Sequence, residues 1–211
     1  MFDFKSLKYI LNETPVFSIE DLSLNPGEKI LLEGKSGSGK STFLKILGLL
    51  NNSYNGSVFY KGTEIKQVKN RELYRRNVLM MMQETFVPLG IKVSDYPDII
   101  KQFKVYNGFN YNTVLFRDLL SVFNLDDSII NRNINEISVG ERQRVVLANM
   151  IVLKPEVLLL DEPTSGLDSV SAAVVFNYLM NECSNMTIFC VSHTVEFFHL
   201  FSKKITFGSF K

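Results

Sequence analysis

One stretch decides the fold of this chain: Gly34-Lys35-Ser36-Gly37-Ser38-Gly39-Lys40-Ser41. It fits the pattern G-x-x-x-x-G-K-[ST], in which glycines let backbone N–H groups approach phosphate oxygens closely. Three consecutive aliphatic residues at 30–32 favour a buried strand before it, and the apolar periodicity of residues 41–50 favours a helix after it. The positive end of that helix would face the same anion. The stretch therefore predicts a phosphate-binding loop.

Two side chains of this phosphate loop (residues 34–41) have expected roles at a nucleotide. Lys40 would reach the β- and γ-phosphates, and the Ser41 hydroxyl would ligate Mg²⁺. The other contacts would come mainly from backbone N–H groups. The residues expected to bind the nucleotide here are Gly34, Lys35, Ser36, Gly37, Ser38, Gly39, Lys40, Ser41 and Thr42.

The rest of the chain alternates between strand and helix patterns. Aliphatic runs between turn residues predict strands at 16–24, 29–33, 56–62, 78–82, 157–160 and 188–191. Apolar periodicity predicts helices at 41–50, 141–152 and 171–183. Residues 84–135 have apolar residues at helical spacing and no convincing strand, which indicates a helical insertion. The alternating order predicts an α/β fold with a parallel sheet and helices on its faces.

The composition is that of a globular protein and excludes several classes of function. The 211 residues include 23 Lys and Arg against 22 Asp and Glu, so the net charge of +1 excludes a strongly basic arm, and no nucleic-acid partner is expected. No apolar run approaches the roughly 20 residues of a membrane-spanning helix, and the N-terminus shows no secretory signal. Cys183 and Cys190 indicate a reducing compartment rather than a disulfide framework.

Two acids follow the aliphatic run at 157–160. Asp161 and Glu162 would lie at the carboxyl end of a parallel strand, which is the sheet edge where ligands bind. Asp161 would hold Mg²⁺ directly or through water, and Glu162 would polarise the water that attacks the γ-phosphate. The alternative is an ordinary loop start, and the phosphate loop upstream favours the catalytic interpretation.

Together these features resemble an ABC-type ATPase over nearly the whole chain, from about residue 21 to residue 193. The resemblance implies a P-loop NTPase parallel-sheet core with a small antiparallel β subdomain and a helical insertion subdomain. It implies one ABC ATPase domain over 1–211, with its core at about 1–83 and 155–211 and its helical subdomain at about 84–154. It also implies that the chain is an ATPase that uses ATP and Mg²⁺.

Three further motifs match the family by position. Gln83 lies 43 residues after Lys40 and matches the Q-loop glutamine, which touches Mg²⁺ or the attacking water. His193 resembles the switch histidine that holds the γ-phosphate and Glu162 in place. Ser165-Gly166-Leu167-Asp168 resembles the D-loop, through which Asp168 would reach the dimer interface, and a helix N-cap is the local alternative.

Residues 138–141, Ser138-Val139-Gly140-Glu141, match the signature motif of the family. In the family this motif caps the nucleotide held by a second copy, which implies Ser138, Gly140 and Glu141 as contacts. Ser138 and Glu141 also form the capping-box pattern S-x-x-E that starts a helix. The family usually has two glycines where this chain has Val139 and Gly140. The side chain of Val139 could hold the backbone away from the phosphate and weaken hydrolysis.

The aromatic residue that the family stacks on adenine has no clear equivalent. The position that corresponds to this aromatic residue, upstream of the phosphate loop, falls near Leu11, and Tyr9 is the nearest aromatic residue. Tyr9 is our prediction for this contact, with Phe17 as the other choice and a plain core role as the alternative.

The resemblance also implies partners. Two copies would sandwich two MgATP head to tail and drive a separate integral membrane permease, so the chain would be cytoplasmic and peripheral on the inner face of the cell membrane. An apolar patch lies where the family docks its permease, although it could equally pack the helical insertion: Phe86, Pro88, Leu89, Val93 and Tyr96. A soluble assembly-factor ATPase and a weakly hydrolytic nucleotide-gated module are the alternative functions.

A narrower similarity connects the chain with bacterial iron-efflux ABC ATPases. It rests on Asp127-Ser128-Ile129-Ile130, on Asn135-Glu136-Ile137 and on Tyr74-Arg75-Arg76. The sequence gives neither the transported substrate nor the direction of transport, because in this family the permease supplies the substrate path.

Overall fold

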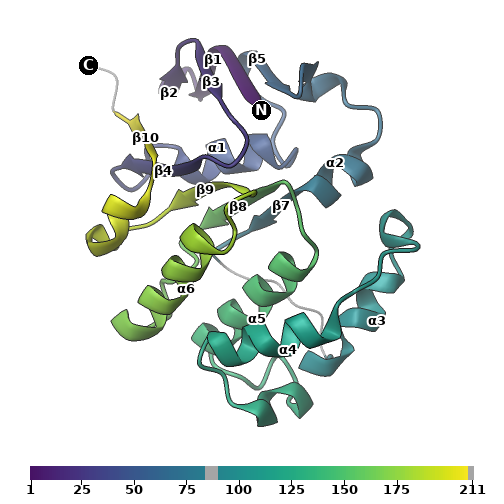
Figure 1. The fold of residues 1–211 in the computed structure, drawn as a ribbon. Helices are drawn as coiled ribbons and strands as arrows, with labels where there is room; N and C mark the ends of the chain where they lie inside the picture. The colour runs from purple at the N-terminus through teal and green to yellow at the C-terminus, as the bar shows by residue number, and fades with distance from the viewer. Residues whose placement is uncertain (84–89, 209–211) are drawn as a thin grey trace.

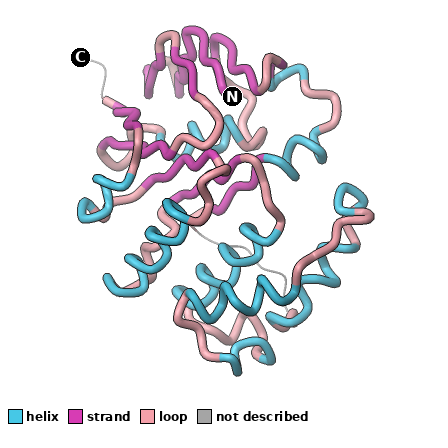
Figure 2. Tube along the Cα trace, viewed as in Figure 1, coloured by secondary structure: helices cyan, strands magenta, loops and turns pink. Residues whose placement is uncertain are grey.

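The computed structural model describes residues 1–83 and 90–208, whose strands form two sheets (Figures 1 and 2). The first sheet is antiparallel, has the order β2-β1-β5-β6, and pairs β3 with β1. Its strands are β1 (Phe2–Leu11), β2 (Thr14–Ile19), β3 (Leu22–Leu24), β5 (Asn55–Tyr60) and β6 (Thr63–Glu64). The second sheet is parallel throughout and has the order β10-β4-β9-β8-β7. Its strands are β4 (Lys29–Gly34), β7 (Val78–Met81), β8 (Val157–Asp161), β9 (Thr187–Val191) and β10 (Lys203–Phe207).

The helices lie on both sides of the parallel sheet. The α-helices are α1 (Lys40–Leu47), α2 (Arg71–Asn77), α3 (Tyr96–Lys101), α4 (Thr113–Val122), α5 (Val139–Val152) and α6 (Ser169–Asn181). Short 3₁₀ helices are η1 (Ile65–Gln67), η2 (Val93–Asp95), η3 (Lys104–Tyr106), η4 (Asp127–Asn131) and η5 (Val195–Leu200). Among the described residues, no helix is long and apolar enough to cross a membrane.

Helix α1 lies between the two sheets because its apolar side chains are buried by both. The Phe43 ring centroid is 5.5 Å from that of Phe4 in β1 and 6.1 Å from that of Phe189 in β9. Phe43 is fully buried, and burying such a ring contributes roughly 1.5–3 kcal/mol. The helix that follows the phosphate loop is therefore fixed against the sheet whose strand ends it faces.

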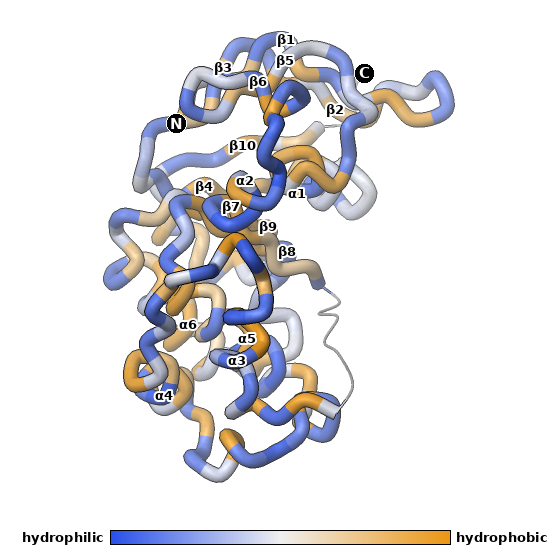
Figure 3. Tube along the Cα trace, turned by 90° about the vertical axis from the view of Figure 1, so that its right-hand side faces the viewer, coloured by the Kyte–Doolittle hydropathy of each residue, from blue (hydrophilic) through white to orange (hydrophobic). Residues whose placement is uncertain are grey.

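The other face of the parallel sheet carries the helical half of the chain, which is the lower half of Figure 1. Leu31 of β4 belongs to the core with these helices, whereas its neighbours Ile30 and Leu32 belong to the core around α1. Parallel strands buried on both faces read as continuous apolar runs. In Figure 3, hydrophobic residues gather where α1 meets the central strands of the parallel sheet.

The α/β fold predicted from the sequence is confirmed, with differences at the edges. The single strand expected over 16–24 is wrong, since the chain forms β2 and β3 with a break at residues 20–21. The sequence interpretation also missed β1 and β10. Strand β1 breaks its own alternation at Ser6, whose φ is 45°, and the pairing with β5 shifts between Lys5 and Lys8. A bulge of this kind hides the period-2 pattern by which a strand is recognised.

Candidate functional site

The phosphate loop is closely packed at two of its glycines. Gly34 has φ 150°, and a Cβ there would lie 2.5 Å from the carbonyl oxygen of Phe207. Gly39 has φ 95°, and a Cβ there would lie 2.5 Å from the ring of Phe17. Helix α1 begins at the next residue and has no acid in its first turn, so its positive end is available to an anion.

Lys40 lies folded over this loop and is only 6% exposed. Its Nζ donates to the carbonyl oxygens of Gly34 at 2.7 Å and Lys35 at 2.9 Å. Burial lowers the pKa of Lys40, and the carboxylates of Glu162 and Asp161 act to raise it. The ammonium group thus sits where a phosphate could replace the carbonyl oxygens as its acceptor.

The Glu162 carboxylate contacts two other predicted site residues. One carboxylate oxygen lies 3.2 Å from Nε2 of His193, and the other accepts from Nε2 of Gln83 at 3.4 Å. Its backbone has φ 53°, and its N–H donates to the carbonyl oxygen of Val191 at 3.0 Å. A left-handed backbone at such a residue costs about 1–2 kcal/mol, so the surrounding strands hold Glu162 in this position against strain.

The cavity next to Glu162 has a volume of about 290 Å³. Its wall contains half of the predicted nucleotide contacts, Leu11, near which the sequence placed the adenine contact, and two further aliphatic residues that were not predicted, Val16 and Val191. The lining residues are Tyr9, Leu11, Val16, Ser36, Gly37, Gly39, Lys40, Ser41, Thr42, Gln83, Glu162, Val191 and His193.

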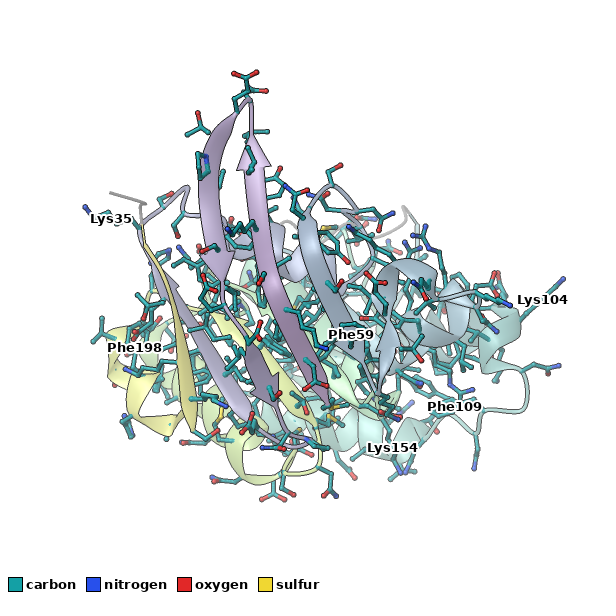
Figure 4. All side chains as sticks on the ribbon, turned by 90° about the horizontal axis from the view of Figure 1, so that it is seen from above. Lys35, Phe59, Lys104, Phe109, Lys154 and Phe198 are labelled. Atoms are coloured by element: carbon teal, nitrogen blue, oxygen red, sulfur yellow. The ribbon has the colours of Figure 1, made fainter. Side chains whose placement is uncertain are left out.

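Besides Ser138, Gly140, Glu141 and Asp168, four more predicted residues lie outside this lining. Gly34, Lys35 and Ser38 line a neighbouring cavity on the other side of the phosphate loop. Lys35 points outward at one edge of the molecule (Figure 4). Asp161 ends β8 and is 6% exposed. It does not reach the cavity surface, although its charge acts on Lys40.

Tyr9 and Phe17 have different positions, which bears on the adenine contact. Phe17 is 2% exposed and packs on Phe43 and Phe207, so a base cannot reach its ring. Tyr9 lines the cavity, and its ring stacks on that of Phe17 at 5.7 Å and 23°. Leu11 lies on the same strand at the tip of the hairpin, two residues on, and is 54% exposed. Leu11 lines the same cavity as Tyr9, at the position where the family resemblance placed the adenine contact.

Residues 138–141 lie away from the cavity and start helix α5. Ser138 Oγ accepts from the N–H of Glu141 at 3.2 Å, and the Glu141 carboxylate accepts from the N–H of Ser138 at 2.8 Å. This is the capping box that the pattern predicts. The hydrogen bond from the Ser138 backbone is the main reason that the pKa of Glu141 is lowered. A hydrogen bond from the Ser138 side chain to the same carboxylate lowers this pKa further.

The D-loop (residues 165–168) packs against the signature motif (residues 138–141). A Cβ at Gly140 would lie 2.5 Å from the carbonyl oxygen of Gly166. Val139 points outward and is 61% exposed, so the motif tolerates a side chain at its first glycine position and not at its second. Asp168 is the N-cap of α6 and accepts from the Ser171 N–H at 2.9 Å, which is the local alternative considered above.

The donor atoms near the phosphate loop fit a magnesium ion that shares its coordination with phosphates. Ser41 and Gln83 line the cavity and offer a hydroxyl and an amide oxygen, and the carboxylate of the buried Asp161 lies beneath the cavity surface. Mg²⁺ is usually bound by one or two carboxylates together with substrate phosphates. Within residues 1–83 and 90–208, no group of three or more His, Cys, Asp or Glu side chains could hold a metal by itself.

The apolar patch expected after Gln83 does not form an exposed surface in its described part. Val93 is fully buried and Tyr96 is 9% exposed, because both pack into the helical core. The remaining members, Phe86, Pro88 and Leu89, lie outside the described residues.

A larger groove of about 580 Å³ lies elsewhere, between α2, the end of α3 and α5. Its lining is mainly apolar and includes Phe103, whose side chain is 55% exposed. Arg76 closes one side by donating to the Val105 carbonyl oxygen at 2.9 Å and lying over the rings of Tyr106 and Phe109. Figure 4 shows Lys104 and Phe109 at the edge of the molecule opposite Lys35.

Comparisons with known proteins identify relatives of the chain. The model of the ABC transporter family matches residues 18–165. The probable iron export ATP-binding protein FetA of Escherichia coli (strain K12) is 31% identical over 206 residues, covering 96% of this chain and 88% of that protein. The lipoprotein-releasing system ATP-binding protein LolD of Rickettsia typhi is 32% identical over 203 residues, covering 94% and 90%. The dimeric structure of the bacterial ABC transporter cassette MJ0796 has the same fold, with a TM-score of 0.83 at 23% identity, covering 98% of this chain and 94% of that one.

Proposed function

We propose roles for the site residues on the basis that this chain belongs to the ABC transporter family, as an ATP-binding cassette that hydrolyses ATP in transport. One observation carries the assignment. Glu162 meets Gln83 and His193 at a cavity whose opposite wall is the phosphate loop with Lys40. A base and its orienting groups therefore face the place where phosphates bind.

The phosphate loop and Tyr9 bind the nucleotide. Backbone N–H groups of residues 36–41 and the positive end of α1 hold the β- and γ-phosphates. Lys40 exchanges its two carbonyl acceptors for phosphate oxygens. The Tyr9 ring, fixed by its stacking on Phe17, supports the base together with the aliphatic side chains of Leu11 and Val16.

Glu162 activates the attacking water. The water oxygen attacks the γ-phosphorus, the bond to the oxygen bridging the β-phosphate breaks, and its electron pair leaves with ADP. The water proton passes to the Glu162 carboxylate. His193 and Gln83 hold that carboxylate in line with the phosphate, and Lys40 stabilises the charge that develops on the phosphate oxygens.

Ser41, Asp161 and Gln83 would hold the Mg²⁺ ion. When bound, the ion would help to neutralise the negative charge of the phosphates. Ser41 lies in the first turn of α1, Asp161 ends β8, and Gln83 follows β7 by two residues.

A second copy of the chain completes the site. Ser138, Gly140 and Glu141 do not line the cavity of their own chain, and the exposed start of α5 at Ser138 and Val139 suits a nucleotide held elsewhere. We place them over the γ-phosphate of the partner subunit in a head-to-tail homodimer, with Asp168 and the D-loop at the interface. The dimeric state of a cassette with the same fold supports this arrangement.

The groove beside Phe103 receives a cytoplasmic segment of a separate membrane permease. Its exposed apolar lining would be covered by the partner, and Arg75, Arg76 and Lys104 at its rim favour an acidic counterpart. We place the chain on the inner face of the membrane through this contact. Relatives of nearly equal identity serve iron export and lipoprotein release, so we assign the choice of substrate to the permease.

Replacing Phe103 with Asp tests this docking surface. We expect Phe103→Asp to abolish co-purification of the permease, because it places a charge in the apolar lining. The ATPase rate of the isolated dimer should stay within about twofold of wild type, since a surface change far from the phosphate loop leaves the site intact. Retention of the permease by the variant would contradict the assignment.

The decisive test of the site is Glu162→Gln. This variant should bind ATP, lose about 10²–10⁴-fold in kcat, and accumulate as an ATP-bound dimer that size-exclusion chromatography detects. Glu33→Gln is the matched control, because Glu33 lies just before the phosphate loop and pairs with Lys204 outside the cavity. An undiminished kcat in Glu162→Gln would contradict the assignment of the base.

A further inference from the structure

Gln143 connects two segments of the chain that the proposed mechanism treats separately. It lies on α5, five residues after Ser138, and is 2% exposed. Its Oε1 accepts from the backbone N–H of Gly166 at 3.2 Å, and its Nε2 donates to the Ser165 hydroxyl at 3.2 Å. The two ends of one buried amide therefore hold the D-loop to the helix that begins at the signature motif.

The backbone around these bonds leaves little freedom for the two segments to slide. A Cβ at Gly140 would lie 2.5 Å from the Gly166 carbonyl oxygen and 2.9 Å from the Leu167 side chain. From the other side, a Cβ at Gly166 would lie 3.1 Å from Gln143 Oε1 and 3.2 Å from a methyl group of Val139. Close packing of this kind makes the signature motif and the D-loop move as one unit.

The same D-loop is bonded to the residue proposed as the base. The backbone N–H of Ser165 donates to the carbonyl oxygen of Glu162 at 3.2 Å. Glu162 has the strained φ of 53°, so its side-chain direction depends on the turn that follows it. A continuous set of contacts thus runs from Gly140 through Gln143, Ser165 and Gly166 to the backbone of Glu162.

We propose that Gln143 is a positioning residue that couples the two ATP sites of the dimer. This inference rests on the proposed function, in which the signature motif of one copy contacts the nucleotide of the other. Engagement of the partner's γ-phosphate by Ser138 and Gly140 sets the position of α5. The amide of Gln143 transfers that position to the D-loop and so orients Glu162 in its own site. By thermodynamic linkage, ATP at either site then favours the competent arrangement at the other.

The test compares steady-state ATP hydrolysis by the wild-type dimer and by Gln143→Leu. We expect about a 10- to 100-fold fall in kcat, since small misplacement of a reacting group has effects of this size. The Hill coefficient for ATP should fall to about 1 because the sites no longer communicate. The affinity of the monomer for a fluorescent ATP analogue should not change, because Gln143 does not line the cavity.

Two further variants separate positioning from mere stability. Tyr111→Phe removes another buried hydrogen bond to α5, the one between Tyr111 and Asn149 at 2.9 Å, and should keep the wild-type Hill coefficient. Gln143→Glu should restore cooperativity in part, since its carboxylate can accept from both the Gly166 N–H and the Ser165 hydroxyl. Ser165→Ala alters an exposed residue and should lower the Hill coefficient in a folded protein.

Several results would overturn the inference. A Hill coefficient and kcat within twofold of wild type in both Gln143→Leu and Ser165→Ala would remove the coupling role. An equal loss of cooperativity in Tyr111→Phe would reduce Gln143 to a structural residue. Loss of activity in Glu162→Gln alongside normal cooperativity in Gln143→Leu would leave the proposed function intact and contradict only the coupling.

Discussion

At the cavity, polar side chains project from strand ends, whereas at the signature motif (residues 138–141) polar side chains turn inward and cap helices. Glu162 exposes its carboxylate to Gln83 and His193, but Glu141 uses its carboxylate on the backbone of Ser138. The first region offers charged and amide groups to a ligand. The second offers the exposed start of α5 at Ser138 and Val139. The ligand-binding role of the cavity can be recognised from the side chains of one chain. The role proposed for residues 138–141 depends on a second copy of the chain.

This contrast predicts its largest effect at Lys40. Lys40→Ala should lower kcat/KM for ATP by about 10²–10³-fold, because it removes a preorganised charge from the developing phosphate charge. Lys45→Ala is the control, since Lys45 is exposed on the same helix and does not line the cavity. Steady-state kinetics measure both variants. Equal losses in the two would show that general charge on α1, rather than the position of Lys40, supports hydrolysis.

The cavity region was largely predictable from the sequence because its residues follow buried strands. Parallel strands end at one edge of a sheet, so Asp161, Glu162 and His193 had to lie near each other once the strands were recognised. Lys40 and Ser41 followed from the phosphate loop. The sequence could not show that Asp161 lies beneath the cavity surface. Its burial depends on where the last residue of β8 lies relative to that surface.

The signature region was less predictable for a physical reason. Its key contact is between the backbones of Gly140 and Gly166, and backbone contacts leave no pattern of residue types beyond the glycines themselves. Gln143 belongs to a largely buried helix, and the sequence does not distinguish its amide from other polar residues until its partners in the D-loop are known. The distinction between Val139 and Gly140 likewise required knowing how each packs on Gly166, where a side chain is accommodated at position 139 and a Cβ at position 140 would clash.

The difference between Val139 and Gly140 predicts the next largest effect. Gly140→Ala should lower kcat by roughly 10- to 100-fold, because the added methyl group meets the Gly166 carbonyl oxygen and displaces the D-loop. Val139→Gly is the matched change at the neighbouring position. It should alter kcat by less than about threefold, since Val139 points outward.

Both variants are measured by ATP turnover of the purified dimer, with circular dichroism to confirm folding. A large gain in rate for Val139→Gly would instead favour the weakly hydrolytic, nucleotide-gated function, in which the valine restrains the motif. Normal turnover in Gly140→Ala would show that the D-loop can move away without affecting catalysis.

The smallest effect is expected at Glu141 and concerns stability. Glu141→Gln keeps an acceptor for the Ser138 N–H and removes the negative charge from the first turn of α5. The free energy of unfolding at pH 7 should fall by about 0.3–1 kcal/mol, the size of an exposed charge at a helix N-terminus. The side chain is 27% exposed, so solvent screening keeps the effect in this range.

The pH dependence of the free energy of unfolding distinguishes the charge of the Glu141 carboxylate from its hydrogen bond to the Ser138 N–H. The Ser138 N–H lowers the pKa of Glu141 below its ordinary value of 4.5. The stabilisation by the carboxylate is therefore complete above that value and is lost as the pH falls through the lower pKa of the folded state. Urea unfolding between pH 7 and pH 3 should show the difference between wild type and Glu141→Gln shrinking toward zero in acid. A difference that stays constant over this range would mean that the carboxylate acts at the signature motif through its shape alone, as the backbone around it does.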